Sequence, residues 1–260
     1  MASNSPTAVN ALTNTINTPT TKYFWGLLTL SIALLLSNTV LAGGTAESST
    51  SEISNVSTHH PQPNLKKTDT SLANTARVSP YQAVYQSTVK GITAELHRSL
   101  EQTAAGQWQL SNVVKILFTG FSELSQFFID NGQVLPWRYQ YNNPISKSRS
   151  SELHFDLDTQ VVIDKKHMQT ALKIPALTTD KLSGQLQLRL DMIGNNGAYK
   201  NKAYTVVDST KLKTYLTEVV GEELVKVLAG EFNAIKIKQF RQGKDKHQLI
   251  WLAKDHQYLI

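Results

Sequence analysis

One short segment places several polar side chains where they could act together. Four polar residues occupy every second position: Glu152, His154, Asp156 and Asp158. On a β-strand this spacing puts them on one face, about 7 Å apart. Carboxylates and an imidazole are donors for a metal ion, and a His–Asp pair can catalyse acid–base chemistry. The alternative is a solvated strand face, which we favour because the residues between them are apolar: Leu153, Phe155 and Leu157.

A second set of candidates consists of large or cationic side chains that could line a ligand cavity: Trp108, Trp137, Arg189 and Trp251. In a curled sheet the tryptophans would line an apolar cavity for a lipid or a glycan. Aromatic residues also dominate protein cores, and this second interpretation is the one we favour. Arg189 lies on a mostly apolar predicted helix, where it would form an ion pair with an internal carboxylate or reach an acidic group of a ligand.

Sequence motifs for the common enzyme classes are missing. The chain contains no Cys, which excludes disulfides, thiolate metal sites and Cys nucleophiles. It contains no Walker A, G-x-G-x-x-G, H-E-x-x-H or G-x-S-x-G motif. Asp180 and Ser183 are therefore expected to begin a helix rather than to catalyse a reaction. We predict no metal and no cofactor, and we favour a protein without enzymatic activity.

The charge of the chain does not indicate a nucleic-acid-binding protein. The formal net charge is +6, and the basic residues are scattered without a run of five or more. A nucleic-acid groove is not expected from such a distribution. Loose attraction to anionic lipid head groups or to acidic polysaccharide remains compatible with it.

The elements that would position these residues are mostly strands, because apolar residues recur at every second position after residue 80. The strand-like segments are 81–85, 92–96, 108–118, 124–129, 134–141, 153–157, 161–163, 204–207, 212–218, 223–227, 232–240 and 247–253. Asp130, Asn131 and Gly132 predict a tight hairpin. Pro136 in the returning strand predicts a sheet edge or a strand start, since Pro cannot donate a hydrogen bond to a neighbouring strand.

One segment has helical spacing instead. Four apolar residues recur at helical intervals: Leu182, Leu186, Leu190 and Ile193. Asp180 is suited to cap the start of this helix, and Gly194 marks its end. The sequence therefore predicts a mainly β fold, either a curled antiparallel sheet or a partly open β-barrel, with one main helix.

The N-terminal region has the pattern of an export signal. Residues 1–42 are interpreted as a disordered leader plus a signal peptide, with Lys22, an apolar run over 23–36 and a small-residue cleavage site at Val40 and Ala42. Residues 43–74 are a predicted flexible linker, and 75–260 are the predicted β-rich domain. We expect a periplasmic protein. The alternative is an inner-membrane anchor facing the periplasm, with membrane contact only through residues 23–42 if they stay uncleaved.

Several short motifs in the domain resemble a known family. They are Tyr81-x-Ala-x-Tyr85 with Gly91, Ser125-x-Phe-Phe with Leu135-Pro136-x-x-Tyr139, Thr179-Asp180-x-Leu182-Ser183 with Leu188-Arg189, and Trp251-x-Ala-x-Asp255 with Tyr258-Leu259. Over nearly all of residues 78–260 the chain resembles the bacterial exported family known as domain of unknown function 3108. The resemblance implies an extracytoplasmic, mostly β protein and no established activity. Members usually have Pro where this chain has Ile260, and they continue with a further strand.

Three functional hypotheses follow. The leading one is a non-enzymatic periplasmic protein that binds a hydrophobic or glycan ligand or supports envelope assembly. The second is a hydrolase of envelope polymers that uses the polar cluster at Glu152, His154, Asp156 and Asp158. The third is an interaction scaffold that pairs through an open sheet edge. The ligand and the oligomeric state remain open at this point.

Overall fold

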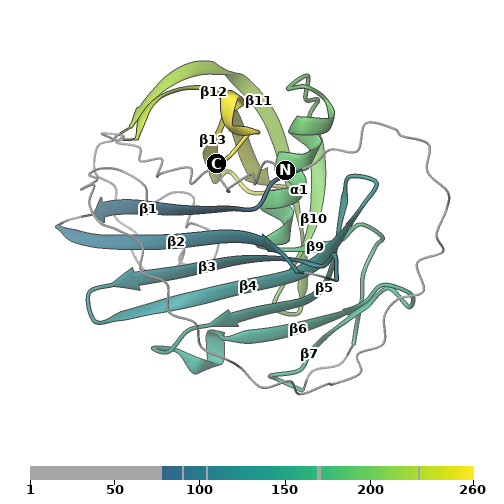
Figure 1. Ribbon diagram of the computed structural model, residues 1–260. Coiled ribbons are helices and arrows are strands. Elements are labelled where there is room, and N and C mark those ends of the chain that lie inside the picture. Colours follow the sequence, from purple (N-terminus) through teal and green to yellow (C-terminus); the bar gives the residue numbers. More distant parts are fainter. Residues whose placement is uncertain (1–77, 90, 104, 169–170, 228) are drawn as a thin grey trace, which may run out of the picture.

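The computed structural model describes residues 78–260, apart from residues 90, 104, 169–170 and 228. The described residues form two sheets with one α-helix between them (Figure 1). The mainly β fold with one helix is therefore confirmed, but the strands divide into two sheets instead of one. The predicted leader, signal peptide and linker lie outside the described residues. Within the described residues, no helix is both long enough and apolar enough to cross a membrane.

The first sheet is an eight-stranded meander in which each strand pairs with the next along the chain. Its strands are β1 (Tyr81–Val89), β2 (Ile92–Gln102), β3 (Trp108–Ile116), β4 (Thr119–Asp130), β5 (Gln133–Asn142), β6 (Ser151–Asp156), β7 (Val161–Asp164) and β8 (Leu172–Lys173). All of its pairings are antiparallel. Alternating burial along these strands confirms the period of two seen in the sequence.

The turn between β4 and β5 is the predicted tight hairpin. Asp130 pairs with Gln133, and Asn131 and Gly132 adopt φ angles of 48° and 76°. Asn and Gly tolerate these left-handed conformations, which a two-residue hairpin needs. β5 as a whole lies inside the sheet, but β6 pairs only with residues 138–141, so Pro136 lies near the start of β5 at a local edge, as predicted. Pro136 is accommodated at a register shift in the β4–β5 pairing, on a part of β5 that β6 does not reach.

The second sheet has five strands in the order β13-β12-β11-β10-β9. They are β9 (Thr179–Asp180), β10 (Lys202–Asp208), β11 (Lys211–Val227), β12 (Gly230–Arg241) and β13 (His247–Ala253). β9 and β10 are parallel, and the other pairs are antiparallel. The two strand-like segments at 212–218 and 223–227 belong to one long strand, β11, because an irregularity between Val219 and Gly221 breaks the apolar pattern without ending the strand.

The helix α1 (Ser183–Gly194) packs between the two sheets, and 3-10 helices at Lys147–Arg149 and Lys254–His256 complete the fold. Leu186 and Leu190 contact the core of the eight-stranded sheet. Leu188 and Met192 join the core of the five-stranded sheet. α1 therefore buries apolar residues on two sides, whereas the helical spacing in the sequence predicted only one apolar face.

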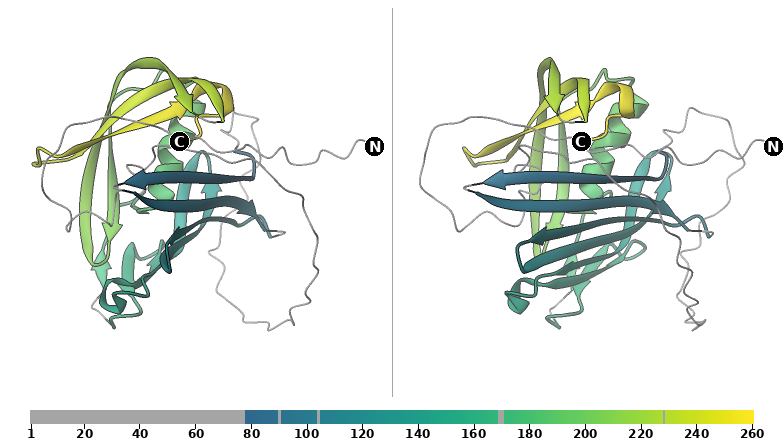
Figure 2. Two further views of the ribbon diagram at one scale, coloured as in Figure 1. Left: turned by 90° about the vertical axis from the view of Figure 1, so that its left-hand side faces the viewer. Right: turned by 60° about the vertical axis from the view of Figure 1, so that its left-hand side comes forward.

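The two sheets curl around α1 without closing into a complete barrel (Figure 2). β1 and β13 are edge strands of their sheets. The last residues of the chain connect the two sides of this opening: the Tyr85 hydroxyl donates to the Ile260 carbonyl at 3.0 Å, and Arg189 Nε donates to the Gln257 carbonyl at 2.7 Å. The structure is therefore the partly open, barrel-like form of the predicted fold.

Candidate functional site

A row of polar side chains crosses the buried face of the eight-stranded sheet. Arg98 on β2 pairs with Asn112 on β3, which pairs with Glu123 on β4. We call these three residues the polar row. Each of them is at most 7% exposed. Buried polar groups are costly unless they are hydrogen-bonded, so a row of three inside a core calls for a specific reason.

The two charged members of the polar row have partners inside the protein. Arg98 Nε donates to the Tyr81 hydroxyl at 2.9 Å, and Arg98 Nη1 donates to Gln185 on α1 at 2.8 Å. Glu123 accepts a hydrogen bond from the Tyr139 hydroxyl at 2.8 Å. Burial and the nearby Glu123 carboxylate raise the pKa of the Tyr139 phenol. These contacts keep the phenol protonated as a donor and hold both charged side chains in place.

Asn112, the central member of the polar row, is different. Its side chain is 1% exposed. Neither its Oδ1 nor its Nδ2 atom has a hydrogen-bond partner among the residues that the structure describes. A side-chain amide offers two acceptor sites and two donors, so this group can bind an incoming polar group from either side. Leaving it unpaired costs about 1–3 kcal/mol.

Next to the polar row, Asp180 fixes the start of α1. Its Oδ1 accepts the backbone N–H groups of Leu182 and Ser183, each at 2.8 Å. Its Oδ2 accepts the hydroxyls of Ser125 at 2.6 Å and Ser183 at 2.7 Å. The Ser183 hydroxyl in turn accepts the Asp180 N–H at 3.1 Å. This reciprocal arrangement confirms Asp180 as the cap and assigns Ser183 a structural role.

Lys181 brings a buried positive charge to the same region. Its Nζ lies 3.9 Å from Glu123 Oε1 and 3.5 Å from Asp208 Oδ1, and it lies 4.9 Å from the centre of the Tyr141 ring. Asp208 also pairs with Lys213. Burial raises the pKa of Asp208, but the ammonium groups of Lys181 and Lys213 outweigh it, and the resulting pKa lies below the ordinary value.

Asp208→Asn is expected to lower the free energy of unfolding at pH 7 by about 1–3 kcal/mol, because it removes a charge-assisted contact with Lys181 and Lys213. A lowered pKa means that this contribution is complete above the unfolded-state pKa of about 4 and disappears as the pH falls through the folded-state pKa. Urea unfolding measured from pH 7 to pH 2 should therefore show the two proteins converging in acid. A constant difference at every pH would contradict the assignment.

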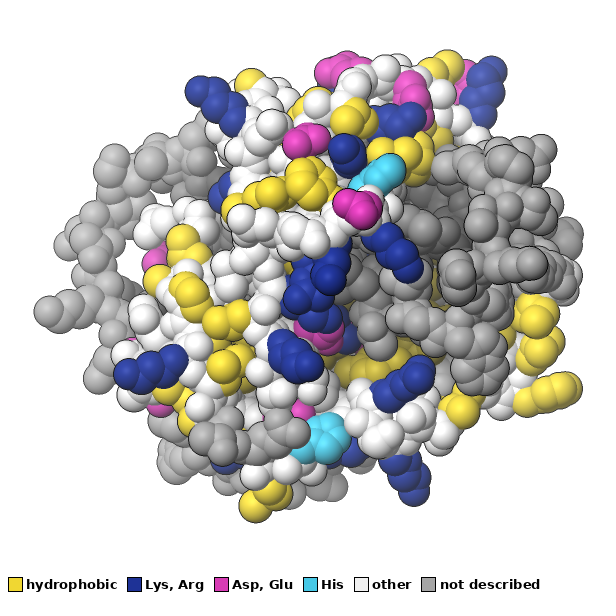
Figure 3. Space-filling model, turned by 180° about the vertical axis from the view of Figure 1, so that it is seen from behind, with side chains coloured by type: hydrophobic (Ala, Val, Ile, Leu, Met, Phe, Trp, Pro, Cys, Tyr) yellow, Lys and Arg dark blue, Asp and Glu magenta, His cyan; other side chains and the backbone are white. Residues whose placement is uncertain are grey.

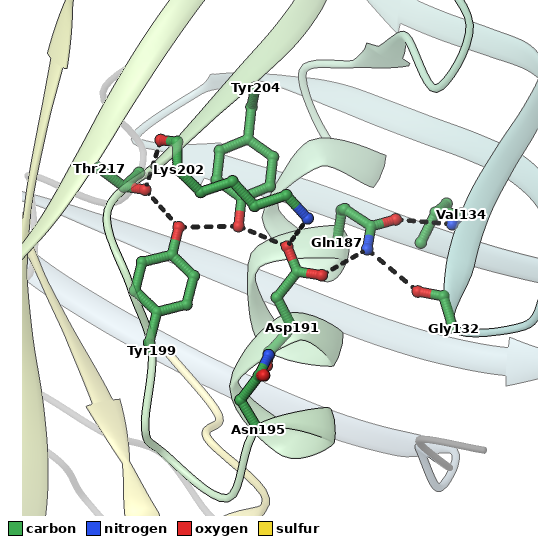
Figure 4. A network of polar contacts seen from close by, with 9 residues as sticks. All are labelled: Gly132, Val134, Gln187, Asp191, Asn195, Tyr199, Lys202, Tyr204 and Thr217. Carbon is green, nitrogen blue, oxygen red and sulfur yellow. Dashed lines mark hydrogen bonds and ion pairs between the residues drawn. The ribbon is translucent and has the colours of Figure 1, made fainter. Parts of the chain in front are cut away.

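A second polar network connects the two sheets through α1 (Figure 4). Gln187 accepts the Val134 N–H at 2.7 Å and donates to the Gly132 carbonyl at 3.0 Å. It also donates to Asp191 at 3.1 Å. On the other side, Asp191 accepts hydrogen bonds from the Tyr204 hydroxyl at 2.6 Å and from Lys202 at 2.7 Å.

The network continues through Tyr199, which lies between α1 and β10 and contacts both Tyr204 on β10 and Thr217 on β11. Burial and the neighbouring Asp191 carboxylate raise the pKa of the Tyr204 phenol above its ordinary value. The phenol therefore stays protonated and serves as a hydrogen-bond donor. Every polar group of this network has a partner within it, so we interpret it as a structural connection between the sheets.

The structure does not assemble the polar cluster that the alternating spacing suggested. Glu152 and His154 lie on β6, with His154 Nε2 3.0 Å from Glu152 Oε1. Asp156 ends that strand and accepts the N–H groups of Asp158 and Thr159. Asp158 lies in the following turn, so the prediction that it shares the strand face is wrong. Among the described residues, no group of three His, Asp or Glu side chains is placed to hold a metal ion.

The predicted ligand-lining residues are also dispersed. Trp108 is buried in the core of the eight-stranded sheet, and Trp137 is half-buried at the register shift of β5. Trp251 on β13 is half-exposed; its indole N–H contacts Glu223, and Lys236 Nζ lies 5.2 Å from its ring centre. The three tryptophans therefore do not line one cavity.

Arg189 is buried, but not as an ion pair. Its guanidinium binds the carbonyl oxygen and the side chain of Gln257 and lies 5.0 Å from the centre of the Tyr81 ring. The described residues include no carboxylate that forms a salt bridge with it, so the predicted ion pair is wrong. A carbonyl and an aromatic face replace the carboxylate only in part, because Arg189 Nη1 is buried without a hydrogen-bond partner among the described residues.

The polar row is not among the residues that the sequence pattern predicted, although a signal is present. Arg98 stands between Leu96 and Leu100 in the alternating pattern of β2. Asn112 stands between Leu110 and Val114 in the same way. A polar residue that takes the place of an apolar one on a buried strand face marks a functional or structural exception.

The face of the molecule opposite to the view of Figure 1 is hollowed. In the space-filling view, Lys and Arg side chains gather around a hollow in which hydrophobic side chains are visible (Figure 3). The arrangement combines apolar surface with cationic groups at the rim. Such a combination suits an amphiphilic molecule better than a purely apolar one.

Comparisons with known proteins give a family but no activity. No curated protein matches the chain. A crystal structure of a β-barrel-like protein of domain of unknown function DUF1849 from Brucella abortus is similar over 70% of this chain and 89% of that chain, with 12% identity and a TM-score of 0.44. The model of the family described as "Protein of unknown function (DUF3108)" matches residues 91–260. The match spans more than half of the sequence and confirms the resemblance seen in its motifs: the chain belongs to the DUF3108 family.

Proposed function

We propose that this chain is an exported, non-enzymatic protein that binds an amphiphilic ligand between its two sheets, with the polar end of the ligand at Asn112. The observation that carries the proposal is the buried Asn112 amide without a hydrogen-bond partner among the described residues. A bound polar group would satisfy it and recover the free energy that the unpaired amide costs. The export pattern in residues 1–42 supports a periplasmic location.

The neighbours of Asn112 suit the polar end of such a ligand. Arg98 and Glu123 flank Asn112 in the polar row, and both are fixed by contacts with tyrosines and α1. Fixed neighbours need no rearrangement when a ligand binds, which lowers the entropic cost of binding. Further along the sheet, the Ser87 hydroxyl on β1, which pairs with Ala94, is also buried and has no partner among the described residues.

The same sheet face offers apolar surface for the rest of the ligand. Beyond Asn112, toward the β3–β4 turn, the next residues on the buried face of β3 are Val114 and Ile116. Val114 pairs with Leu96 on one side and with Phe121 on the other. Ile116 and Phe121 are only partly buried. An apolar chain of a lipid would therefore lie along side chains that become more accessible toward this end of the sheet.

The test uses the full chain, lysophosphatidylglycerol as the amphiphilic probe and a chitooligosaccharide as the glycan probe. Native mass spectrometry and titration calorimetry should show that the lipid probe binds. Asn112→Leu keeps the branching and the number of side-chain heavy atoms and removes both polar atoms, so it should weaken lipid binding by about tenfold or more. The fold should remain, because an apolar residue no longer leaves a buried amide unpaired.

His154→Ala with Asp156→Ala is the matched control, because these residues lie on the solvated side of β6. It should bind the lipid probe like the wild type. Binding of the glycan probe without binding of the lipid probe would overturn the proposal of an amphiphilic ligand and indicate a glycan ligand instead. Unchanged lipid binding by Asn112→Leu, or no binding of either probe, would reject Asn112 as the binding group.

A further inference from the structure

The turn between β3 and β4 exposes two large apolar side chains. Ile116 pairs with Thr119, so Leu117 and Phe118 alone form the turn; we call these two residues the tip. Phe118 is 103% exposed and Leu117 is 72% exposed. The neighbouring β2 begins at Ile92, which is 45% exposed. The β1–β2 and β3–β4 turns lie at the same end of the sheet, on the left in Figure 1.

The tip is unfavourable for the isolated fold. Leu117 has a φ of 49°, a left-handed conformation that is rare for a bulky residue. The other end of β4 meets the same geometric requirement with Asn131 and Gly132, the residues that such turns prefer. Backbone strain and full exposure of apolar side chains both cost free energy. Their combination at one turn indicates that the tip contacts another molecule.

The size and shape of the tip indicate what it contacts. A stable protein partner usually covers about 800 Å² on each side, which the two tip residues and Ile92 together do not supply. A lipid leaflet accepts a small apolar projection without a complementary shape, and the affinity rises with the apolar area inserted. The net charge of +6 adds attraction to anionic head groups.

We propose that Leu117 and Phe118, together with Ile92, insert into the surface of an anionic lipid bilayer and dock the folded domain there. This contact is separate from the predicted export signal at residues 23–42. It also goes beyond the proposed ligand site, because it concerns the outer end of the sheet and needs no bound ligand.

The test replaces the tip by the turn that hairpins prefer. Leu117→Asn combined with Phe118→Gly should keep or raise the melting temperature, since it relieves the strain at Leu117. Binding to vesicles of phosphatidylcholine with phosphatidylglycerol, measured by flotation of the purified domain without added ligand, should fall by about tenfold or more. Vesicles of phosphatidylcholine alone should bind the wild type more weakly.

Leu177→Asn is the matched control, because Leu177 is also exposed, at 59%, with a φ of 60°, but precedes β9 instead of forming the tip. It should float with vesicles like the wild type, and so should Asn112→Leu, which affects only the proposed ligand site. Unchanged flotation of the tip variant would overturn the proposal. So would a dimer in vesicle-free solution that the tip variant abolishes, because the tip would then contact a second copy of the chain.

Discussion

Asp180→Ala is expected to lower the free energy of unfolding by about 3–5 kcal/mol. The substitution leaves the N–H groups of Leu182 and Ser183 without their acceptor at the start of α1. It also removes the acceptor of the Ser125 hydroxyl on β4. Asp180 is completely buried, so water cannot replace these contacts without a rearrangement. Urea unfolding followed by tryptophan fluorescence measures the change.

Asp180→Asn is the matched control, because the amide keeps an oxygen for the two N–H groups. It should cost about 1 kcal/mol or less at pH 7. Burial raises the pKa of Asp180 above its ordinary value, against the effect of the hydrogen bonds from Ser125 and Ser183. The wild type should therefore gain stability relative to Asp180→Asn as the pH falls from neutrality through this raised pKa toward about 4. Equal losses in the Ala and Asn variants would contradict the capping role.

Asp191→Ala is expected to lower the free energy of unfolding by about 2–4 kcal/mol. Asp191 is the acceptor shared by Gln187 on α1 and by Lys202 and Tyr204 on β10. Without it, the buried Tyr204 hydroxyl loses its acceptor on the helix side, and the connection from α1 to the five-stranded sheet is broken. Hydrogen exchange should show lower protection in β10 and β11 than in β2 and β3.

Asn195→Ala serves as the control for this network. Asn195 also follows α1 and donates to the Asp191 backbone carbonyl, but this contact is exposed. The substitution should change the stability by about 0.5 kcal/mol or less. If Asp191→Ala reduced protection uniformly over both sheets, the network would not be the specific connection between them.

Much of the fold could be predicted because strand patterns are local. The period of two located most strands, and Asn131 with Gly132 fixed one hairpin. The division into two sheets could not be predicted, because it depends on which strands pair over long distances. Pro136 shows what a local rule can give: it predicted the local edge on which Pro136 lies, but not that β5 continues into the interior of the sheet.

The candidate site was less accessible from the sequence. The spacing of His154 and Asp158 suggested a shared face, but a turn after Asp156 separates them. Asn112 gave only a weak signal, since one polar residue in an apolar pattern is common. Its importance depends on the partners that surrounding elements fail to provide, which is a property of tertiary structure.

The apolar residues on two sides of α1 have a consequence for how the chain reaches its native state. In both sheets most strands pair with their neighbours along the sequence, so either sheet can form early, and one expected intermediate has α1 packed on the eight-stranded sheet alone. In such an intermediate, Leu188 and Met192 face water until β10, β12 and β13 arrive. The helix then exposes an apolar surface during folding. Substitutions that delay the pairing of these strands would promote aggregation even where the native protein tolerates them.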